Sequence, residues 1–223
     1  MSISVAIVAP GNMGAGIGRR LVDNGVRILT SLAGRSAASA KRAEAAGMAA
    51  VDDAALVRAD FLLSIVPPGE AVAFAERMAP HLASAAAKPV FVDCNAISPE
   101  TVGRIATIVA PTAAAFVDGG IIGAPPQPGT KGTVLYVSGE AASRVLALGA
   151  HGLDVRVVPG GVGAASALKM SYAGITKGLT ALGAAMMLGA SRAGVAEALY
   201  EELATSQPAL LPWFTRQIPG MYQ

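Results

Sequence analysis

The sequence predicts an α/β protein, with a mostly parallel sheet covered by helices on both faces, followed by an all-helical segment. Three observations predict it. Up to about residue 158, short runs rich in β-branched residues alternate with Ala-rich stretches of helical length. The β-like runs are apolar without interruption, which is typical of strands buried on both faces. After Pro159-Gly160-Gly161 no β-like run appears. We therefore predict an α/β domain at residues 1–160 and a helical domain at 161–223.

The elements of the first domain follow from this alternation. We expect strands at residues 3–9, 26–30, 61–66, 89–93, 115–118, 133–138 and 154–158, and helices near 14–24, 37–46, 69–79, 98–109 and 141–151. Gly25 and Gly47 lie where helices end, and Ser98-Pro99-Glu100 is a typical helix start.

The second domain begins with a long Ala-, Gly-, Leu- and Met-rich stretch at residues 162–193. It is apolar on nearly every face, so we expect a helix that is buried all round, in its own domain or a partner's. Another helix follows from Val195. The sequence stops without a convincing last element, so we expect this domain to be truncated.

The composition excludes several classes of protein. Hydrophobic residues make up 53% of the chain and charged residues 14%, which excludes intrinsic disorder. The net charge of +2 and the lack of a Lys/Arg cluster argue against nucleic acid. The longest uncharged apolar stretch, at 178–191, is shorter than the roughly 20 residues that span a bilayer. The single cysteine, Cys94, fits a reducing cytoplasm, and no set of His, Cys, Asp and Glu has the spacing of metal ligands.

A glycine-rich segment follows the first predicted strand. Ala9-Pro10-Gly11-Asn12-Met13-Gly14 opens the first predicted helix, in a G-x-G-x-x-G pattern with Ala9 in the first position. Gly11 would let the backbone approach a pyrophosphate, and Gly14 would let the helix pack on the strand. The helix N-terminus at residues 12–15 would stabilise the phosphate charge. We therefore predict a Rossmann domain that binds a dinucleotide, the alternative being a tight structural turn.

The second strand bears on which dinucleotide is bound. NAD-binding proteins place an acidic residue at its end, but here no Asp or Glu occurs between Asn24 and Ala43. The sequence has Gly34-Arg35-Ser36 instead, and Arg35 and Ser36 would suit the 2′-phosphate of NADP. We therefore expect NADP rather than NAD, the alternative for Arg35 being a solvated residue that caps a loop.

With these and later segments the chain resembles the β-hydroxyacid dehydrogenase superfamily, which includes 6-phosphogluconate and 3-hydroxyisobutyrate dehydrogenases. It is most similar to the phosphogluconate dehydrogenase-like branch, whose helical C-terminal domain is uncharacterised. The resemblance covers nearly the whole chain. It rests on Gly11-Asn12-Met13-Gly14, Gly34-Arg35-Ser36, Leu63-Ser64-Ile65-Val66-Pro67-Pro68, Val92-Asp93-Cys94-Asn95-Ala96, Asp118-Gly119-Gly120-Ile121-Ile122-Gly123 and Ala167-Leu168-Lys169-Met170-Ser171-Tyr172.

The resemblance implies roles for several residues. Val66 and Pro67 match the loop that contacts adenosine and ribose, and Asn95 matches a Ser/Thr pair near the nicotinamide. Ile122 and Gly123 match the segment that cradles a substrate carboxylate, with Ile122 in place of the usual serine.

Lys169 matches the family's catalytic lysine. The asparagine usual one helical turn later is Ala173, with Tyr172 beside it, and Tyr172 either contacts substrate or caps a core. Lys169 is also the first charge after Arg156 and stands in the most apolar segment, where desolvation would favour the neutral amine. It would exchange the alcohol proton during hydride transfer. Alternatively, it reaches to the surface or pairs with a carboxylate.

Together with the resemblance, these residues predict an NADP-dependent oxidoreductase acting on a small hydroxy or keto acid, with Lys169 as the proton-transfer residue. The alternatives are a cofactor-binding protein without turnover, such as a sensor, and an imine-reductase-like activity. The apolar helix at 162–193 further predicts a homodimer, in which these helices pack against the partner's Rossmann domain.

Overall fold

The structure, a computed structural model, describes residues 3–127, 129–130 and 132–222. It divides into two compact units, Met1–Met170 and Ser171–Gln223. The long helix α7 (Ala164–Arg192) contributes its first turns to the first unit and the rest to the second. The units therefore divide inside a helix, ten residues beyond the 160/161 boundary expected from the end of the last strand.

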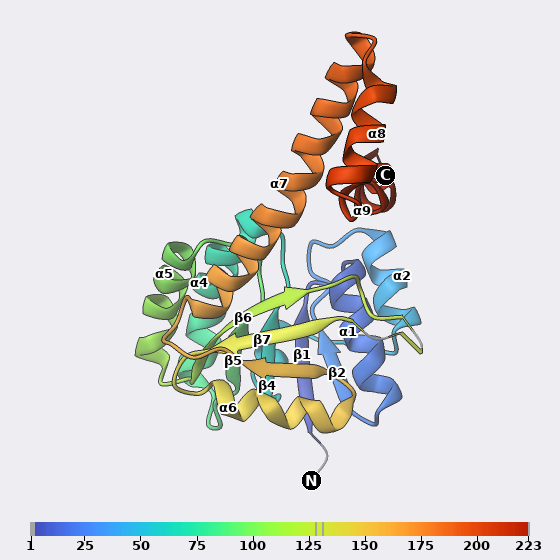
Figure 1. Ribbon diagram of the computed structural model, residues 1–223. Helices are drawn as coiled ribbons and strands as arrows, with labels where there is room; N and C mark the ends of the chain where they lie inside the picture. Colours follow the sequence, from blue (N-terminus) through green and yellow to red (C-terminus); the bar gives the residue numbers. More distant parts are fainter. Residues whose placement is uncertain (1–2, 128, 131, 223) are drawn as a thin grey trace. The chain divides into compact units, whose positions relative to one another are not determined.

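The first unit is built on an eight-stranded sheet (Figure 1). The strands are β1 (Ser4–Val8), β2 (Arg27–Thr30), β3 (Ala49–Ala50), β4 (Phe61–Ser64), β5 (Val90–Asp93), β6 (Phe116–Ile122), β7 (Val134–Ser138) and β8 (Asp154–Val157). Their order is β3-β2-β1-β4-β5-β6-β7-β8, and every pair is parallel except β6 and β7. The mostly parallel sheet is therefore confirmed.

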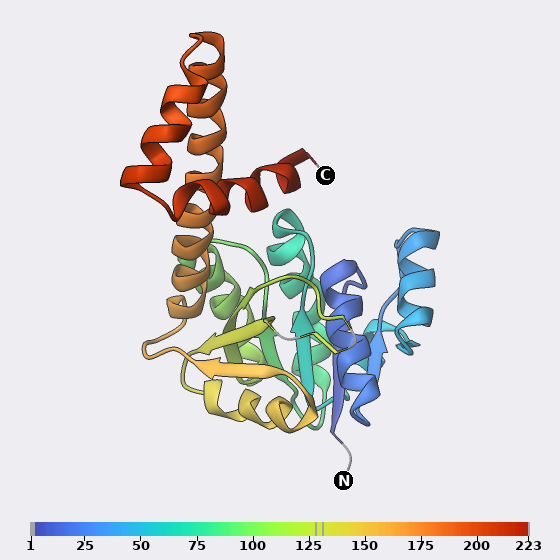
Figure 2. The same cartoon turned by 45° about the vertical axis from the view of Figure 1, so that its right-hand side comes forward.

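Helices cover both faces of this sheet (Figure 2). They are α1 (Asn12–Asp23), α2 (Ala37–Ala45), α3 (Asp53–Leu56), α4 (Ala71–Ser84), α5 (Pro99–Val109) and α6 (Ala142–Val145), with 3-10 turns η1 (Pro68–Glu70), η2 (Ala110–Thr112) and η3 (Leu146–His151).

Successive side chains of β1 belong to the hydrophobic cores on opposite faces of the sheet, because the side chains of a strand alternate in direction. Val5 and Ile7 pack with side chains of α1, α6 and η3, whereas Ala6 and Val8 pack with those of α4 and α5. Both faces of the sheet are therefore buried, as the unbroken apolar runs predicted.

The structure adds short elements that the sequence pattern did not indicate. β3 has two residues and α3 only one turn, begun by Asp52, whose carboxylate accepts a hydrogen bond from the Ala55 N–H. β6 runs four residues beyond the predicted end at Asp118, because Gly119 and Gly120 continue the extended strand. The helix expected at 141–151 is one α-helical turn followed by 3-10 turns.

The second unit is helical, as predicted. It holds the later turns of α7 with α8 (Ala196–Ser206), α9 (Leu210–Gln217) and the 3-10 segment η4 (Ile218–Tyr222). The Phe214 ring of α9 lies directly over Gly183 of α7, where an added Cβ would collide with it. Gly183 therefore allows these two helices to pack closely.

Of the two alternatives for α7, burial all round within its own domain is wrong, and burial against a partner stays a prediction. Ile175 is 70% exposed, Leu182 59% and Met186 58%. The reason is that a unit of so few helices cannot cover every side of a 29-residue helix. Among the described residues, α7 alone has the length and apolar composition of a membrane-crossing helix, a test that core helices of other proteins also pass.

Candidate functional site

The glycine-rich segment joins β1 to α1. Packing requires glycine at one of its two glycine positions but not at the other. An added Cβ on Gly14 would collide with the Ala9 carbonyl oxygen, so α1 can pack on the end of β1 only with glycine there. An added Cβ on Gly11 would meet no atom within 4 Å. The packing of the fold therefore does not require glycine at position 11. Because Gly11 has no side chain, the space in front of the helix is open.

That space faces the start of α1. Gly11 is the N-cap residue in extended conformation, at φ −70° and ψ −176°, and it offers no side chain to cap the helix. The N–H groups of the first turn, which includes Asn12 and Met13, have no acceptor within the helix and form its positive end. Asn12 is exposed, and Met13 packs partly against the core. The arrangement fits a pyrophosphate, with backbone N–H groups as donors.

Polar side chains gather at the start of α2, beside this segment. Ser36 is the N-cap residue of α2, and its Oγ accepts a hydrogen bond from the Ser39 N–H at 3.3 Å. Arg42 donates from Nε to the Pro10 carbonyl at 3.1 Å and from Nη2 to Ser39 Oγ at 3.1 Å. α2 is therefore tied directly to the glycine-rich segment. Sequence reasoning missed Ser39 and Arg42, because only the fold brings Arg42 to Pro10.

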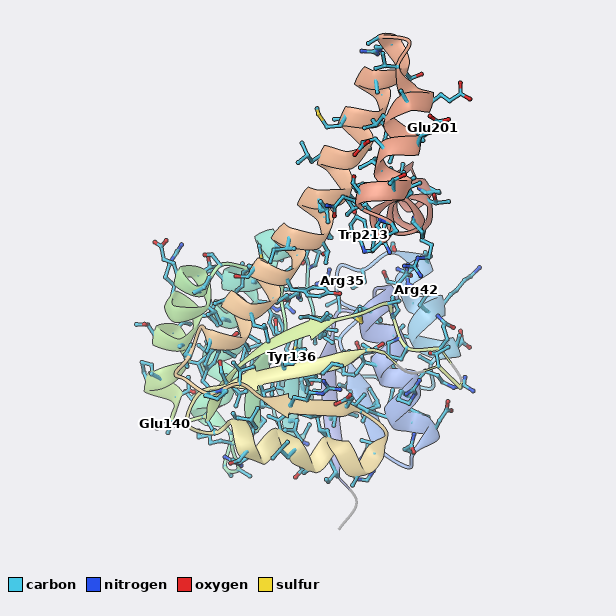
Figure 3. All side chains as sticks on the ribbon, in the orientation of Figure 1. Arg35, Arg42, Tyr136, Glu140, Glu201 and Trp213 are labelled. Atoms are coloured by element: carbon cyan, nitrogen blue, oxygen red, sulfur yellow. The ribbon has the colours of Figure 1, made fainter. Side chains whose placement is uncertain are left out.

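Arg35 lies in the same region, as Figure 3 shows with Arg42. Its Nη2 is 3.1 Å from Oε2 of Glu70, and the two side chains are 18% and 52% exposed. Glu70 ends η1, in the loop after β4. The sequence pattern gave no sign of this carboxylate, because it comes from a different loop and not from the end of β2.

Asn95 joins the ends of β4 and β5. Its Oδ1 accepts from the Val66 N–H at 2.8 Å, and its Nδ2 donates to Ser64 Oγ at 2.8 Å and to Asp93 Oδ2 at 2.9 Å. Asn95 is buried, whereas Pro67 is exposed. The amide of Asn95 thus fixes the backbone from which Val66 and Pro67 extend.

Burial raises the pKa of Asp93 to about 6, although hydrogen bonds from Asn95 and the charge of Lys169 lower it. Burial likewise raises the pKa of the neighbouring Cys94 thiol. The thiol is therefore protonated at neutral pH, as expected for a small buried side chain.

A buried carboxylate fixes the start of α7. Oδ2 of Asp118, on β6, accepts from the N–H groups of Gly163 and Ser166 at 2.9 and 3.0 Å. Its Oδ1 accepts from Ser166 Oγ at 2.6 Å, and Ser138 Oγ on β7 donates to Oδ2 at 3.0 Å. Asp118 therefore holds the first turn of α7 against the sheet, where its negative charge suits the helix N-terminus.

Lys169 follows Ser166 by three residues and so lies one turn further along α7. Its Nζ is 3.5 Å from the Cys94 carbonyl oxygen, just beyond β5. An added Cβ on Gly120 would lie 3.2 Å from Lys169 Cβ and 2.8 Å from the Ala165 carbonyl oxygen. Glycine in β6 therefore lets α7 approach closely enough to place a half-buried lysine at the carboxyl edge of the sheet, near Asp93.

The residues matched to substrate binding lie at two places. Ile122 ends β6 half-buried, and Gly123 follows it with a positive φ of +117°. An added Cβ on Gly123 would collide with the Gly132 carbonyl oxygen, so packing alone explains why glycine occupies this position. Tyr172 is 51% exposed on the part of α7 that belongs to the second unit. The described residues contain no group of three or more His, Cys, Asp or Glu that could hold a metal ion.

Comparison with known proteins bears on the dinucleotide site. The family model for the NAD binding domain of 6-phosphogluconate dehydrogenase matches residues 4–149. The structure of MTH1747, a conserved protein of unknown function described as structurally similar to 3-hydroxyacid dehydrogenases, is 28% identical with a TM-score of 0.81, covering 98% of this chain and 82% of that one. A search of the curated proteins finds no match.

Two further solved structures are similar at 22% identity, which shows the fold alone. The 3-hydroxyisobutyrate dehydrogenase of Mycobacterium tuberculosis has a TM-score of 0.73 and covers 93% of this chain and 72% of its own. The imine reductase of Myxococcus stipitatus in complex with NADP⁺ has a TM-score of 0.74 and covers 94% and 73%.

Proposed function

Because the chain belongs to the family of the 6-phosphogluconate dehydrogenase NAD-binding domain, we propose that it is an oxidoreductase for a small hydroxy or keto acid. The observation that supports this most is the position of Lys169. Its half-buried side-chain nitrogen lies beside the carboxyl end of β5, the edge of the sheet at which open α/β proteins bind their ligands.

The chemistry needs a hydride carrier and a group that exchanges a proton. A bound nicotinamide dinucleotide supplies the hydride donor or acceptor. When an alcohol is oxidised, its C–H pair leaves as hydride, and neutral Lys169 accepts the hydroxyl proton as the carbonyl forms. In the reverse direction, protonated Lys169 donates that proton to the developing alkoxide.

Substitution of Lys169 tests this proposal. We expect Lys169→Ala to lower kcat on a responsive acid by about 10²–10⁴-fold, the usual contribution of a general acid or base. The dissociation constant for NADPH should change little, because the glycine-rich segment and α2 remain. Lys177→Ala, on the same helix, is the matched control. Normal turnover by the Lys169 variant would contradict the assignment, and turnover of cyclic imines but of no acid would favour imine reduction instead.

For the dinucleotide we propose NADP rather than NAD. Support comes from Arg35, Ser36 and Arg42, which provide two guanidinium groups and a hydroxyl on α2 and just before it. Arg35→Ala should weaken NADPH binding by about 1.5–3 kcal/mol, the range for a lost charged hydrogen bond, and NADH binding much less. The exposed Arg144→Ala is the matched control. Equal weakening of both dinucleotides would contradict the preference.

We further propose that two copies of the chain associate through α7. Six exposed apolar side chains follow one another along this helix at alternating steps of four and three residues: Leu168, Tyr172, Ile175, Leu179, Leu182 and Met186. This is the spacing at which two helices pack along a continuous seam. A second copy presents the same stripe, so a two-fold axis would pair the two stripes with each other. This arrangement differs from the one expected from the sequence, in which α7 packs against the partner's Rossmann domain.

A further inference from the structure

The contact between Arg35 and Glu70 joins the loop proposed to bind the 2′-phosphate to the loop that the resemblance assigns to adenosine and ribose. Arg35 precedes α2, and Glu70 ends the short helix η1 after β4. The atoms Nη2 and Oε2 lie 3.1 Å apart, and the residues are 35 positions apart in the sequence. The guanidinium group proposed to bind a 2′-phosphate therefore already has an anionic partner.

Both partners are held by their backbones. The Arg35 N–H donates to the Leu32 carbonyl at 3.0 Å, in a turn where Gly34 has φ +70°. The Glu70 N–H donates to the Pro67 carbonyl at 2.8 Å. The Glu70 side chain is 52% exposed, so water can replace its contact with Arg35. The pair is thus well placed but exchangeable.

Arg42, the second guanidinium of this region, is engaged differently. It donates to a main-chain carbonyl and to a hydroxyl, and both are neutral acceptors. A phosphate that contacts Arg42 displaces no negative charge, whereas one that contacts Arg35 competes with a carboxylate for the same N–H group.

We propose that Glu70 is a specificity-determining residue, which competes with the 2′-phosphate of NADP for Arg35 and thereby moderates the preference for NADP over NAD. The inference rests on the proposed binding of NADP. NAD has a hydroxyl in place of this phosphate, so it can bind with the Arg35–Glu70 pair intact. NADP must weaken the pair and also bring its phosphate near a carboxylate.

The test measures dissociation constants for NADPH and NADH with purified full-length chain by calorimetric titration. Glu70→Gln should lower the dissociation constant for NADPH about threefold to tenfold, the size of a one-charge interaction across a few ångströms in a partly solvated site. The constant for NADH should change less than about twofold. The gain for NADPH should shrink with added salt, because salt screens exposed charges.

Glu140→Gln is the matched control, because it removes the same charge from an exposed residue at a distance from Arg35 (Figure 3). It should leave both constants unchanged. Since Glu70 is half exposed, the melting temperature of Glu70→Gln should equal that of the wild type, which excludes altered folding as the cause.

A second background shows whether Glu70 acts through Arg35. In Arg35→Ala, the further change Glu70→Gln should improve NADPH binding less than in the wild type, because the guanidinium that it would release is gone. An equal gain in both backgrounds would overturn the proposal, and so would equal changes for NADPH and NADH. Wild-type chain that binds neither dinucleotide would instead refute the proposed function itself.

Discussion

The two units use apolar residues differently. In the first unit the apolar side chains of each buried strand are covered, and buried polar groups such as Asp93 and Asp118 have hydrogen-bond partners. In the described part of the second unit only Thr180, Gly183 and Phe214 are buried, while Ile175, Leu182 and Met186 are among the exposed side chains. An apolar composition therefore does not by itself predict burial. The first unit covers its own core, and the second leaves an apolar surface uncovered.

The largest effect on the free energy of unfolding is expected at Asp118, the buried carboxylate that accepts several hydrogen bonds in the first unit. Asp118→Ala should lower the free energy of unfolding by about 3–5 kcal/mol, because it leaves the Gly163 and Ser166 N–H groups without an acceptor and creates a cavity. Asp118→Asn should cost about half as much, since its amide oxygen can still accept from both. Denaturant unfolding measures each value. A loss below about 1 kcal/mol for the alanine variant would mean that Asp118 does not hold the start of α7.

A smaller effect is expected at Asp93, whose contribution to the free energy of unfolding depends on pH. Burial raises the pKa of this carboxyl group from 3.8 to about 6. Between these values the folded chain keeps a proton that the unfolded chain has lost, so the contribution of Asp93 to stability falls as pH rises from about 4 to 6. Above pH 6 the loss is complete, on the order of 2–3 kcal/mol.

Asp93→Asn, which has no proton to lose, should remove this component. The measurement is the free energy of unfolding between pH 4 and 7 for both chains. Their difference should change across the window and stay constant above it. Parallel curves throughout would show that Asp93 has an ordinary pKa in the folded chain.

The smallest effect on folding is expected on the stripe of α7. Ile175→Gln should change the unfolding free energy of a single chain by no more than about 0.5 kcal/mol, because the side chain is 70% exposed. The same change should weaken the proposed dimer, and sedimentation equilibrium should show more monomer at equal concentration. Wild-type chain that is only monomeric at micromolar concentration would contradict the dimer and leave the stripe unexplained.

Local sequence patterns predicted most elements of the first unit, because short apolar strands alternate regularly with helices along the chain. Apolar runs of strand length and glycines at helix ends placed the major elements. The end of β6 was missed, because Gly119-Gly120 has the composition of a loop. Only the packing explains it: an added Cβ on Gly119 would lie 2.9 Å from the Asp93 carbonyl oxygen, so the close approach to β5 needs glycine.

Part of the candidate site could be located from a local motif. Gly11 and Gly14 could be read from their place between strand and helix. Arg42 and Glu70 could not, because their partners Pro10 and Arg35 lie 32 and 35 residues away in the sequence. The exposure of α7 could not be predicted from the sequence either. Composition shows that a helix is apolar but not which parts of the protein cover it.

Substitution of Gly11 tests directly whether the start of α1 binds a pyrophosphate through its backbone N–H groups. Asp is a favoured N-cap residue, and position 11 is extended with open space for a side chain. Gly11→Asp should therefore fold with an unchanged or higher melting temperature, while its carboxylate occupies the N–H groups and repels phosphate. In calorimetric titration with NADPH, the wild-type chain should saturate and Gly11→Asp should show no saturable binding. Equal binding by both chains, or none by the well-folded wild type, would show that α1 does not bind the pyrophosphate of a dinucleotide in this way.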